Sequence, residues 1–436
     1  MTAHEELLAR HRNVLPHWLT LSYEHPIAIV DGSGCEVVDA EGKRYLDFFG
    51  GILTTMCGYN VPEVVDAIRT QAGRMLHTST LYLIEPMIEL AERISELSTI
   101  PDAKVFFTTS GSEANEAALL MASTHRRSNQ VLALRNSYHG RSFATMGMTG
   151  NRGWSASSLS PFVVHYVQNG YRFRSPFGHL DDAGFTEAVV RDVRDVIVTC
   201  TAGDVAAMVI EPIQGVGGFT VPPDGMWGAV QEVLREYGIL YVSDEVQTGW
   251  GRTGDHFWGY QAHGVEPDLV TFAKGIGNGL PVAGVIGRPE LMDSITANSI
   301  STFGGNPLVS AGALANLQYL LDHDLQANAA EQGKRIRAVL EPLVDRFDAV
   351  GEVRGKGLMI GVELVQPDGR TPSPELATQV IEGTRAAGLL LGKGGLFGNC
   401  LRIAPPLSLS TEEATRGAEL VVQAVEEAVS ASAHTA

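Results

Sequence analysis

The sequence has few cysteines, and it has fewer basic than acidic residues. Its four cysteines lie far apart, and no two of them have the spacing of a metal or redox motif: Cys35, Cys57, Cys200 and Cys400. This pattern predicts reduced thiols in a protein core, in a reducing compartment. The 32 Lys and Arg residues face 50 Asp and Glu residues, a formal net charge of −18. A chain this acidic is not expected to bind nucleic acid or an anionic membrane surface.

Long apolar runs are missing as well. None reaches the roughly 20 residues that a membrane-spanning helix needs. The first 12 residues include Glu5 and Glu6 and have no apolar centre, so neither a signal peptide nor a transit peptide is expected. We therefore expect a cytoplasmic protein. With 436 residues, 44% of them hydrophobic, the chain is long enough for two closely packed domains.

Apolar runs alternate with helical patterns between residues 104 and 290, which predicts an α/β fold with a mostly parallel, doubly wound sheet. The expected strands are residues 104–108, 131–135, 205–210, 239–243, 269–273 and 281–286. The expected helices of this part are residues 61–76, 85–97, 110–127, 226–237 and 308–321. Residues 150–185 show weak periodicity and are expected to form a long surface excursion, a kind of segment that often covers an active site.

The two ends of the chain predict a smaller α+β domain. Residues 27–47 read as a strand meander, and the pattern changes again after about residue 325. The expected C-terminal elements are helices at 325–347, 374–387 and 411–430 and strands at 353–365 and 401–404. We thus expect an N-terminal segment (1–50) that contributes to the small domain, a large domain (51–325) and a C-terminal small domain (326–436).

Charged residues stand at the carboxyl ends of expected strands. Asp244 and Glu211 each follow an apolar strand, and Lys274 ends another. Ligands of an open α/β sheet bind outside this edge, so Asp244 and Lys274 would face one crevice. Pyridoxal phosphate (PLP) requires a lysine for a Schiff base and a carboxylate for its pyridinium nitrogen. The pair therefore predicts a PLP-binding large domain.

A turn of small residues precedes a strongly helical segment. Ser110 and Glu113 match the capping box S-x-x-E, and Gly111 and Ser112 begin the helix. Free N–H groups and the helix dipole favour a phosphate at such a place, although a capped helix without a ligand would have the same sequence. Tyr138 follows the next strand and is suited to stack on a cofactor ring, or it is an ordinary loop tyrosine.

Taken together, these motifs resemble the class III aminotransferases, which have the fold type I PLP fold. The matching stretches run from residues 45–47 to 401–406 and cover nearly the whole chain in the same order and separation. Within the class, the chain is most similar to the alanine–glyoxylate aminotransferase 2 type. The stretches that carry this closer likeness are residues 77–80, 257–259, 273–279 and 354–361.

The resemblance implies a ping-pong transaminase that moves an amino group from an amino acid or omega-amine to a keto acid such as pyruvate or glyoxylate. Lys274 would hold PLP as a Schiff base and shuttle a proton. Asp244 would keep the pyridine nitrogen protonated, and Tyr138 and Val246 would pack against the two ring faces. The other cofactor residues that the resemblance implies are Ser110, Gly111, Ser112, His139, Glu211, Gln247 and Thr302.

The resemblance also implies a substrate pocket and a homodimer. Arg402 would bind a substrate carboxylate through two parallel hydrogen bonds, and Glu211 would pair with Arg402 when the bound amine has no carboxylate there. Thr302 would complete the phosphate site of the neighbouring subunit, which puts the sites at the subunit interface. The implied pocket walls are Gly51, Ile52, Tyr82 and Trp18.

Other functions remain open on the sequence alone. Lys274 and Asp244 would serve a PLP-dependent epimerase or phospho-amine lyase equally well. The glycines at 275–279 have some likeness to a dinucleotide loop but lack its third glycine, and no G-x-x-x-x-G-K-[ST] loop occurs. A non-catalytic binding module on the same fold is disfavoured by the intact lysine and aspartate.

Overall fold

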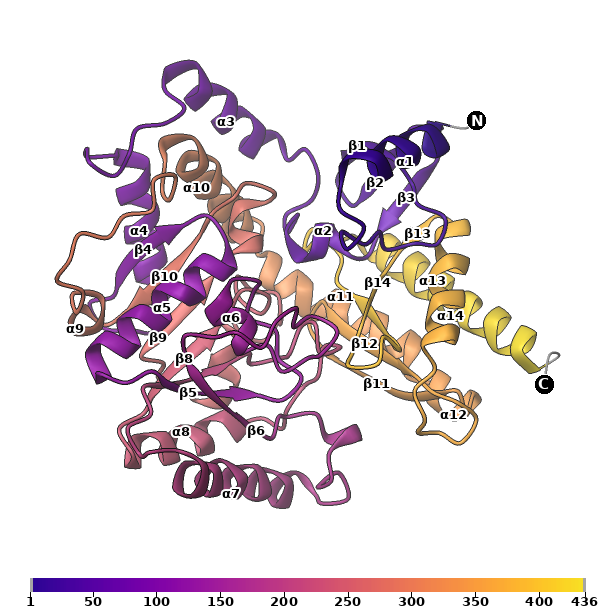
Figure 1. The fold of residues 1–436 in the computed structure, drawn as a ribbon. Coiled ribbons are helices and arrows are strands. Elements are labelled where there is room, and N and C mark those ends of the chain that lie inside the picture. The colour runs from indigo at the N-terminus through magenta and orange to yellow at the C-terminus, as the bar shows by residue number, and fades with distance from the viewer. Residues whose placement is uncertain (1–2, 434–436) are drawn as a thin grey trace.

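The computed structural model describes residues 3–433, which fold around one large sheet and two small ones (Figure 1). The large sheet has seven strands in the order β4-β10-β9-β8-β7-β5-β6. Their bounds are β4 (Lys104–Thr108), β5 (Gln130–Leu134), β6 (Val163–Val167), β7 (Ala207–Ile210), β8 (Leu240–Asp244), β9 (Leu269–Phe272) and β10 (Ala283–Gly287). The strands from β6 to β9 are parallel, and β10 is antiparallel to both of its neighbours. The predicted fold class is confirmed.

Helices cover both faces of this sheet because its strands are apolar on both sides. Val131 and Ala133 of β5 pack toward α5 (Gly111–Arg126). The alternate residues Leu132 and Leu134 join a second cluster with α7 (Asp182–Cys200) and α8 (Met226–Glu236). Figure 1 shows α5 on one side of the strands and α7 and α8 on the other. The central parallel strands thus bury two apolar faces and project their carboxyl ends to one edge of the sheet.

The expectation that residues 150–185 form a long surface excursion was wrong over part of that range. It contains β6, the edge strand, and a short 3-10 turn at Arg172–Arg174, and it ends in the first turn of α7. Also missed were α6 (Phe143–Gly147) and most of α7. The edge strand is only partly buried, with Val163 exposed, so it lacks the continuous apolar run of a central parallel strand.

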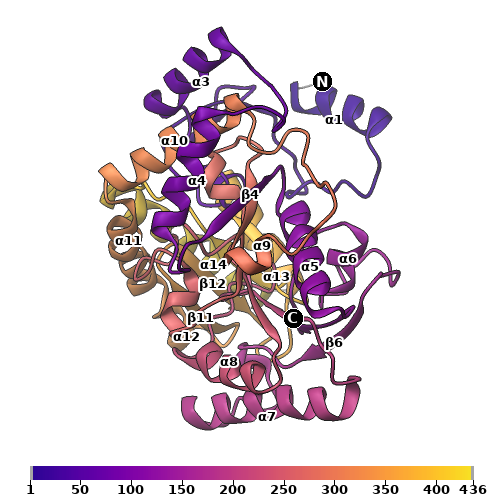
Figure 2. The same ribbon diagram turned by 90° about the vertical axis from the view of Figure 1, so that its left-hand side faces the viewer.

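The other helices beside the large sheet are α3 (Pro62–Arg74), α4 (Glu85–Leu97), α9 (Pro289–Met292) and α10 (Pro307–Asp322), and α1 (Ala3–Val14) precedes the first strand. Figure 2 shows α3, α4 and α10 together at the end of the molecule opposite α7. Phe49 is followed by α2 (Gly50–Leu53), a single turn with left-handed backbone angles.

The small sheets combine the two ends of the chain. One contains β1 (Ile29–Ser33), β2 (Glu36–Asp39), β3 (Arg44–Asp47) and β13 (Leu389–Leu390). The other contains β11 (Val350–Lys356), β12 (Met359–Leu364), β15 (Cys400–Ile403) and β14 (Gly392–Gly394). Only β13 joins the N-terminal meander, so the remaining C-terminal strands form a sheet of their own (Figure 1).

Four helices pack beside the small sheets, namely α11 (Leu325–Leu340), α12 (Leu343–Arg346), α13 (Pro374–Ala386) and α14 (Thr411–Ala433). The helix expected at 325–347 is interrupted at Pro342, which begins a separate short helix. The strand expected at 353–365 is a hairpin that turns at Gly357, where φ is +50°.

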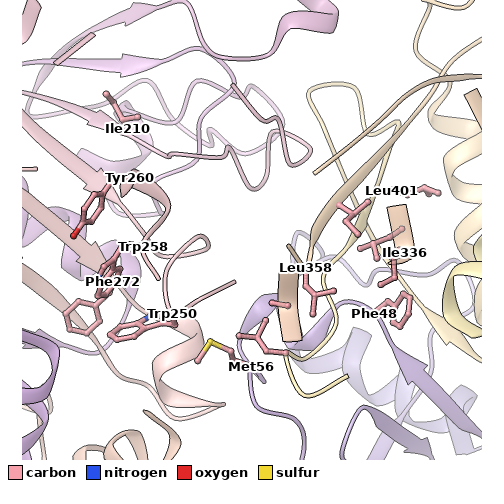
Figure 3. Close-up of a cluster of buried hydrophobic side chains, with 14 of the residues drawn as sticks. Phe48, Met56, Ile210, Trp250, Trp258, Tyr260, Phe272, Ile336, Leu358 and Leu401 are labelled. Atoms are coloured by element: carbon pink, nitrogen blue, oxygen red, sulfur yellow. The ribbon is translucent and has the colours of Figure 1, made fainter. Parts of the chain in front are cut away.

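One apolar core connects the large sheet to the small sheets. Figure 3 shows Trp250, Trp258 and Phe272 on one side and Leu358 and Phe48 on the other, with the Met56 side chain between the two groups.

Cys35, Cys57 and Cys400 are buried, but Cys200 is exposed at the end of α7, so the expectation of a core thiol was wrong for Cys200. Among residues 3–433, no helix combines the length and hydropathy required to cross a membrane.

Candidate functional site

A cavity of about 350 Å³ lies at the carboxyl edge of the large sheet. Asp244 at the end of β8 and Lys274 just after β9 both line it, as their positions at strand ends predicted. The other predicted residues on its wall are Ser110, Gly111, Ser112, Tyr138, His139, Glu211, Val246 and Gln247. One crevice therefore contains a lysine, two carboxyl groups, an aromatic ring and a helix N-terminus.

The start of α5 has the shape of a phosphate cradle. Ser110 Oγ accepts a hydrogen bond from the Glu113 N–H at 3.2 Å, which confirms the predicted cap. The Glu113 carboxylate reaches back one residue further than expected, to the N–H of Thr109 at 2.8 Å. A Cβ on Gly111 would lie 3.1 Å from Val246, a tight contact beside the cavity, and the first-turn N–H groups are free of helical partners. These residues fit a bound phosphate.

Asp244 is held by a buried network. Its Oδ2 accepts hydrogen bonds from Asn115 Nδ2 and from His139 Nδ1, both at 2.8 Å, and its Oδ1 accepts from the Val246 N–H at 3.1 Å. The amide oxygen of Asn115 in turn accepts from Thr271 Oγ1 at 2.8 Å. The carboxylate is thereby aimed by its neighbours, which suits it to bind a pyridinium nitrogen.

His139 is bonded to Asp244, so its main contact is with the carboxylate, whereas the sequence suggested a cofactor ligand. Burial lowers the pKa of His139, but the hydrogen bond and charge of Asp244 outweigh this effect and raise the pKa above the usual value. Sequence reasoning missed Asn115. Asparagine is unfavourable inside a helix, so its position within the predicted helix 110–127 was a signal that could have identified Asn115 as a site residue.

Lys274 has a backbone φ of +48°, in the left-handed region that residues with a Cβ rarely occupy. Such strain persists where the surrounding structure determines it, commonly at functional sites. Burial lowers the pKa of its amine to about 8. Asp244 and Glu211 act in the opposite direction, and the Arg402 cation lowers the pKa further. A lysine with this pKa can both accept and return a proton near neutral pH.

Glu211 is bonded to backbone groups in this structure, and its predicted pairing with Arg402 in the presence of an amine without a carboxylate stays a prediction. Its two carboxyl oxygens accept hydrogen bonds from the N–H groups of Tyr138 and Gly215, each at 2.9 Å. Burial raises the pKa of Glu211 to about 7, and the neighbouring Asp244 charge adds to the increase. Glu211 therefore fixes the loop that carries Tyr138.

The Tyr138 ring contacts Trp154 edge to face, with 5.6 Å between ring centroids. Trp154 was also missed by the sequence analysis. It lies in the loop between α6 and β6, so part of the expected excursion does border the site.

Arg402 lies on β15 and is only 3% exposed. Its Nη2 donates to Gln247 Oε1 at 2.8 Å, and its guanidinium carbon lies 4.6 Å from the Phe219 ring centroid and 5.2 Å from that of Phe49. Burial lowers the pKa of Arg402 to about 10. Gln247 thus connects this cation to the cavity wall.

The remaining predicted residues lie outside the cavity lining. Thr302 and Tyr82 are exposed, as are Gly51 and Ile52 on α2. Trp18 is exposed and lies under the guanidinium of Arg141. The backbone N–H of Arg141 donates to Ser112 Oγ at 3.1 Å.

Comparison with known proteins gives a consistent picture. Residues 20–425 match the family model described as "Aminotransferase class-III". A relative from Arabidopsis thaliana, alanine–glyoxylate aminotransferase 2 homolog 2, mitochondrial, is 39% identical over 412 residues, which cover 94% of this chain and 84% of that protein.

Two solved structures are similar over nearly the whole chain. A thermostable (S)-enantioselective omega-transaminase from Thermomicrobium roseum has a TM-score of 0.90 and 34% identity, with 98% of this chain and 100% of that chain covered. A phospholyase from Arthrobacter in complex with phosphoethanolamine has a TM-score of 0.88 and 34% identity, with 96% and 99% covered.

Proposed function

The chain belongs to the class III aminotransferases, and we propose that Lys274, Asp244 and the first turn of α5 perform its chemistry. It is a PLP-dependent transaminase that moves an amino group from an amino acid or omega-amine donor to a keto acid, such as pyruvate or glyoxylate, in a ping-pong reaction. The observation that carries the residue assignment is that Lys274 and Asp244 line one cavity together with the α5 N-terminus.

Each part of the cavity has a role in binding PLP. The N–H groups of Gly111 and Ser112 would hold the phosphate, and Asp244 would hold the pyridine nitrogen. The side chains of Val246 and Tyr138 would pack against the ring, and the Lys274 amine would hold the cofactor covalently. When bound, PLP supplies an electron sink for the negative charge that develops at the substrate carbon.

Lys274 moves the proton. With a pKa of about 8, its free amine is partly neutral at physiological pH and can take the proton from the donor carbon. His139 and Asn115 keep the Asp244 carboxylate in place.

Arg402 binds the substrate carboxylate. Its present partner, the neutral Gln247 amide, is weaker than a carboxylate, so an arriving keto acid displaces it. Arg402 donates to Gln247 while the oxygens of Glu211 accept from backbone N–H groups, so Gln247 is the internal partner that Arg402 returns to. Substrates with a carboxylate are thus favoured over amines that lack one.

A homodimer with sites at the subunit interface is part of the proposal. Large apolar side chains are exposed around Thr302, including Ile300 and Phe303, and Phe303 contacts His77 in the segment that leads to Leu83, which is 94% exposed. Exposed apolar surface of this kind is typical of an interface. Light scattering should give twice the chain mass, and replacing Thr302 by Val should weaken PLP binding. A monomer that retains full PLP affinity would contradict this.

We also infer that residues 1–50 and 326–436 act as one small domain beside a large domain of residues 51–325, and that the protein works in the cytoplasm. The sharing of β13 supports the first inference. The buried free thiols Cys35, Cys57 and Cys400 support the second, since they suit a reducing compartment. The name of the Arabidopsis relative includes "mitochondrial", so cell fractionation is the appropriate test.

The visible spectrum of the purified protein tests the assignment. Addition of an amine donor should remove the absorption band of lysine-bound cofactor, and pyruvate should restore it and yield alanine. Lys274→Ala should abolish this cycle. The likeness to a phospholyase favours a second candidate, a phospho-amine lyase, and the same framework supports an epimerase. Release of ammonia and phosphate, or a racemised product, without alanine would identify these reactions instead.

A further inference from the structure

The α2 turn is left-handed. Four consecutive residues have positive φ, namely Gly50 at 52°, Gly51 at 58°, Ile52 at 65° and Leu53 at 63°. The N–H of Leu53 donates to the Phe49 carbonyl at 3.0 Å, and that of Thr54 to the Gly50 carbonyl at 2.8 Å. These are the four-residue steps of a helical turn, here of opposite hand. A β-branched residue such as Ile52 is a rare occupant of this region.

A buried carboxyl group anchors the start of the turn. Asp47 Oδ1 accepts hydrogen bonds from the N–H groups of Phe49 at 2.8 Å and Gly50 at 3.1 Å, and its Oδ2 accepts from the Tyr59 hydroxyl at 2.5 Å. At the other end, Thr54 Oγ1 donates to the Gly51 carbonyl at 2.7 Å. Strained backbone of this kind persists only where its surroundings hold it.

The residue before the turn contacts Arg402 directly. The Phe49 ring lies between the guanidinium, 5.2 Å from its centroid, and the backbone of Gly392, where a Cβ would come within 2.2 Å of the ring. Gly392 is the register partner of Arg402 in the β14–β15 pair. The last residue of the turn, Leu53, belongs to the buried cluster of Phe219, which is the second ring on Arg402. The turn is therefore connected to both rings that lie against this cation.

We propose that the left-handed turn Gly50–Leu53 is a positioning device for Arg402. It holds Phe49 and Leu53 so that the guanidinium is enclosed by two rings and presents its Nη2 edge to the cavity. The inference rests on the proposed role of Arg402 in binding the substrate carboxylate. Phe49 is a positioning residue. A right-handed turn of the same residues would point the Phe49 and Leu53 side chains away from the positions that they occupy now, beside Arg402 and Phe219.

The hand of the turn is tested by a pair of variants that differ by one methyl group. In a right-handed helix Ala is more stable than Gly, whereas at positive φ the order is reversed. We expect Ile52→Gly to unfold about 1–3 °C above Ile52→Ala. Gly73 in the right-handed α3 has open space around its Cα and is the control, because Gly73→Ala should raise the unfolding temperature. An Ile52→Ala protein as stable as Ile52→Gly, or more so, would overturn the left-handed turn.

The positioning role is tested with two acceptors, pyruvate and an uncharged aldehyde. A Cβ on Gly51 would lie 2.7 Å from Thr54 Oγ1, so Gly51→Ala should disturb the turn. We expect Gly51→Ala and Phe49→Leu to raise KM for pyruvate roughly three- to thirtyfold through loss of the ring–cation contact. The KM of Phe49→Leu for the aldehyde should stay unchanged, as should both KM values of Gly73→Ala. Phe49→Leu keeps the turn and answers the question if Gly51→Ala fails to fold.

These measurements distinguish failure of the proposed transaminase function from failure of the positioning role of the turn. If the wild-type holoenzyme yields no alanine from pyruvate, the proposed function is wrong, and the unfolding temperatures still report the hand of the turn. If wild type is active but the variants weaken both acceptors equally, or neither, the positioning role is overturned while transamination stands.

Discussion

Two buried arginines flank the same glycine in the C-terminal sheet. Arg354 on β11 pairs with Gly361 on β12, and Gly361 pairs with Arg402 on β15. Arg354 donates to the carboxylates of Glu352 at 2.7 Å and Glu363 at 3.0 Å, and to the Gly218 carbonyl. Within the described chain, no carboxylate lies at ion-pair distance from Arg402, whose side-chain partner is the Gln247 amide.

The pKa values of the two arginines move in opposite directions. Burial lowers the pKa of both, but for Arg354 the adjacent Cys400, Tyr171 and two carboxylates raise it well above the ordinary value. For Arg402 burial prevails, and the pKa falls to about 10. A buried guanidinium with its own carboxylates is part of the structure. One with a neutral partner has its charge uncompensated, and a substrate carboxylate supplies the missing charge.

Removal of Arg354 should have the largest effect on stability. Arg354→Met removes the cation of Glu352 and leaves buried Glu363 with Arg174 as its remaining cation, so we expect a loss of up to about 3–5 kcal/mol in the free energy of unfolding. Denaturant titration measures it. Arg335→Met, at an exposed pair on α11, is the control and should cost at most about 1 kcal/mol. Equal losses for the two variants would remove the contrast between structural and functional arginines.

Removal of Arg402 should instead affect catalysis. In Arg402→Met no carboxylate loses its cation, so we expect little change in the unfolding temperature. The KM for pyruvate should rise roughly 30- to 1,000-fold, as for the loss of a charge-assisted pair worth about 2–4 kcal/mol. Steady-state kinetics with pyruvate and with an uncharged aldehyde separate carboxylate binding from general damage. Unfolding as severe as in Arg354→Met would show that Arg402 is structural too.

Gln247→Glu should make Arg402 resemble Arg354. The new carboxylate has the same shape as the amide that now accepts from Arg402, and it competes with the substrate. We expect the KM for pyruvate to rise about tenfold, equivalent to about 1.4 kcal/mol, relative to the KM for the aldehyde. An unchanged KM for pyruvate would mean that Gln247 and the substrate do not compete for Arg402.

The smallest expected effect is on pH dependence. Proton transfer requires the neutral amine of Lys274, so its rate should rise as pH increases through about 8 and level off above. Burial is the main cause of that lowered pKa, and the Arg402 cation contributes. In Arg402→Met the midpoint should therefore move to higher pH, as measured by single-turnover kinetics with an amine donor. In Arg354→Lys, which keeps its charge, the midpoint should not move.

Much of the fold and the cofactor site could be predicted from local sequence. Strands such as β7 and β8 are buried throughout because both faces are covered, and Asp244 comes directly at a strand end. The cap at Ser110 depends on a bond across only three residues. By contrast, β6 is half buried and has no clear strand pattern. The role of Asn115 could not be predicted, because it depends on a hydrogen bond to Asp244, 129 residues away.

The sequence by itself determined the sheet, the helix cap and the meeting of Lys274 with Asp244, because parallel strands send their carboxyl ends to one edge. Only the tertiary structure decided that Arg402 donates to Gln247, which is 155 residues away in the chain, and not to Glu211. It also decided the hand of the turn at Ile52. Nothing local favours positive φ for isoleucine, and the hydrogen bonds of Asp47 and the packing of Leu53 and Phe49 impose it.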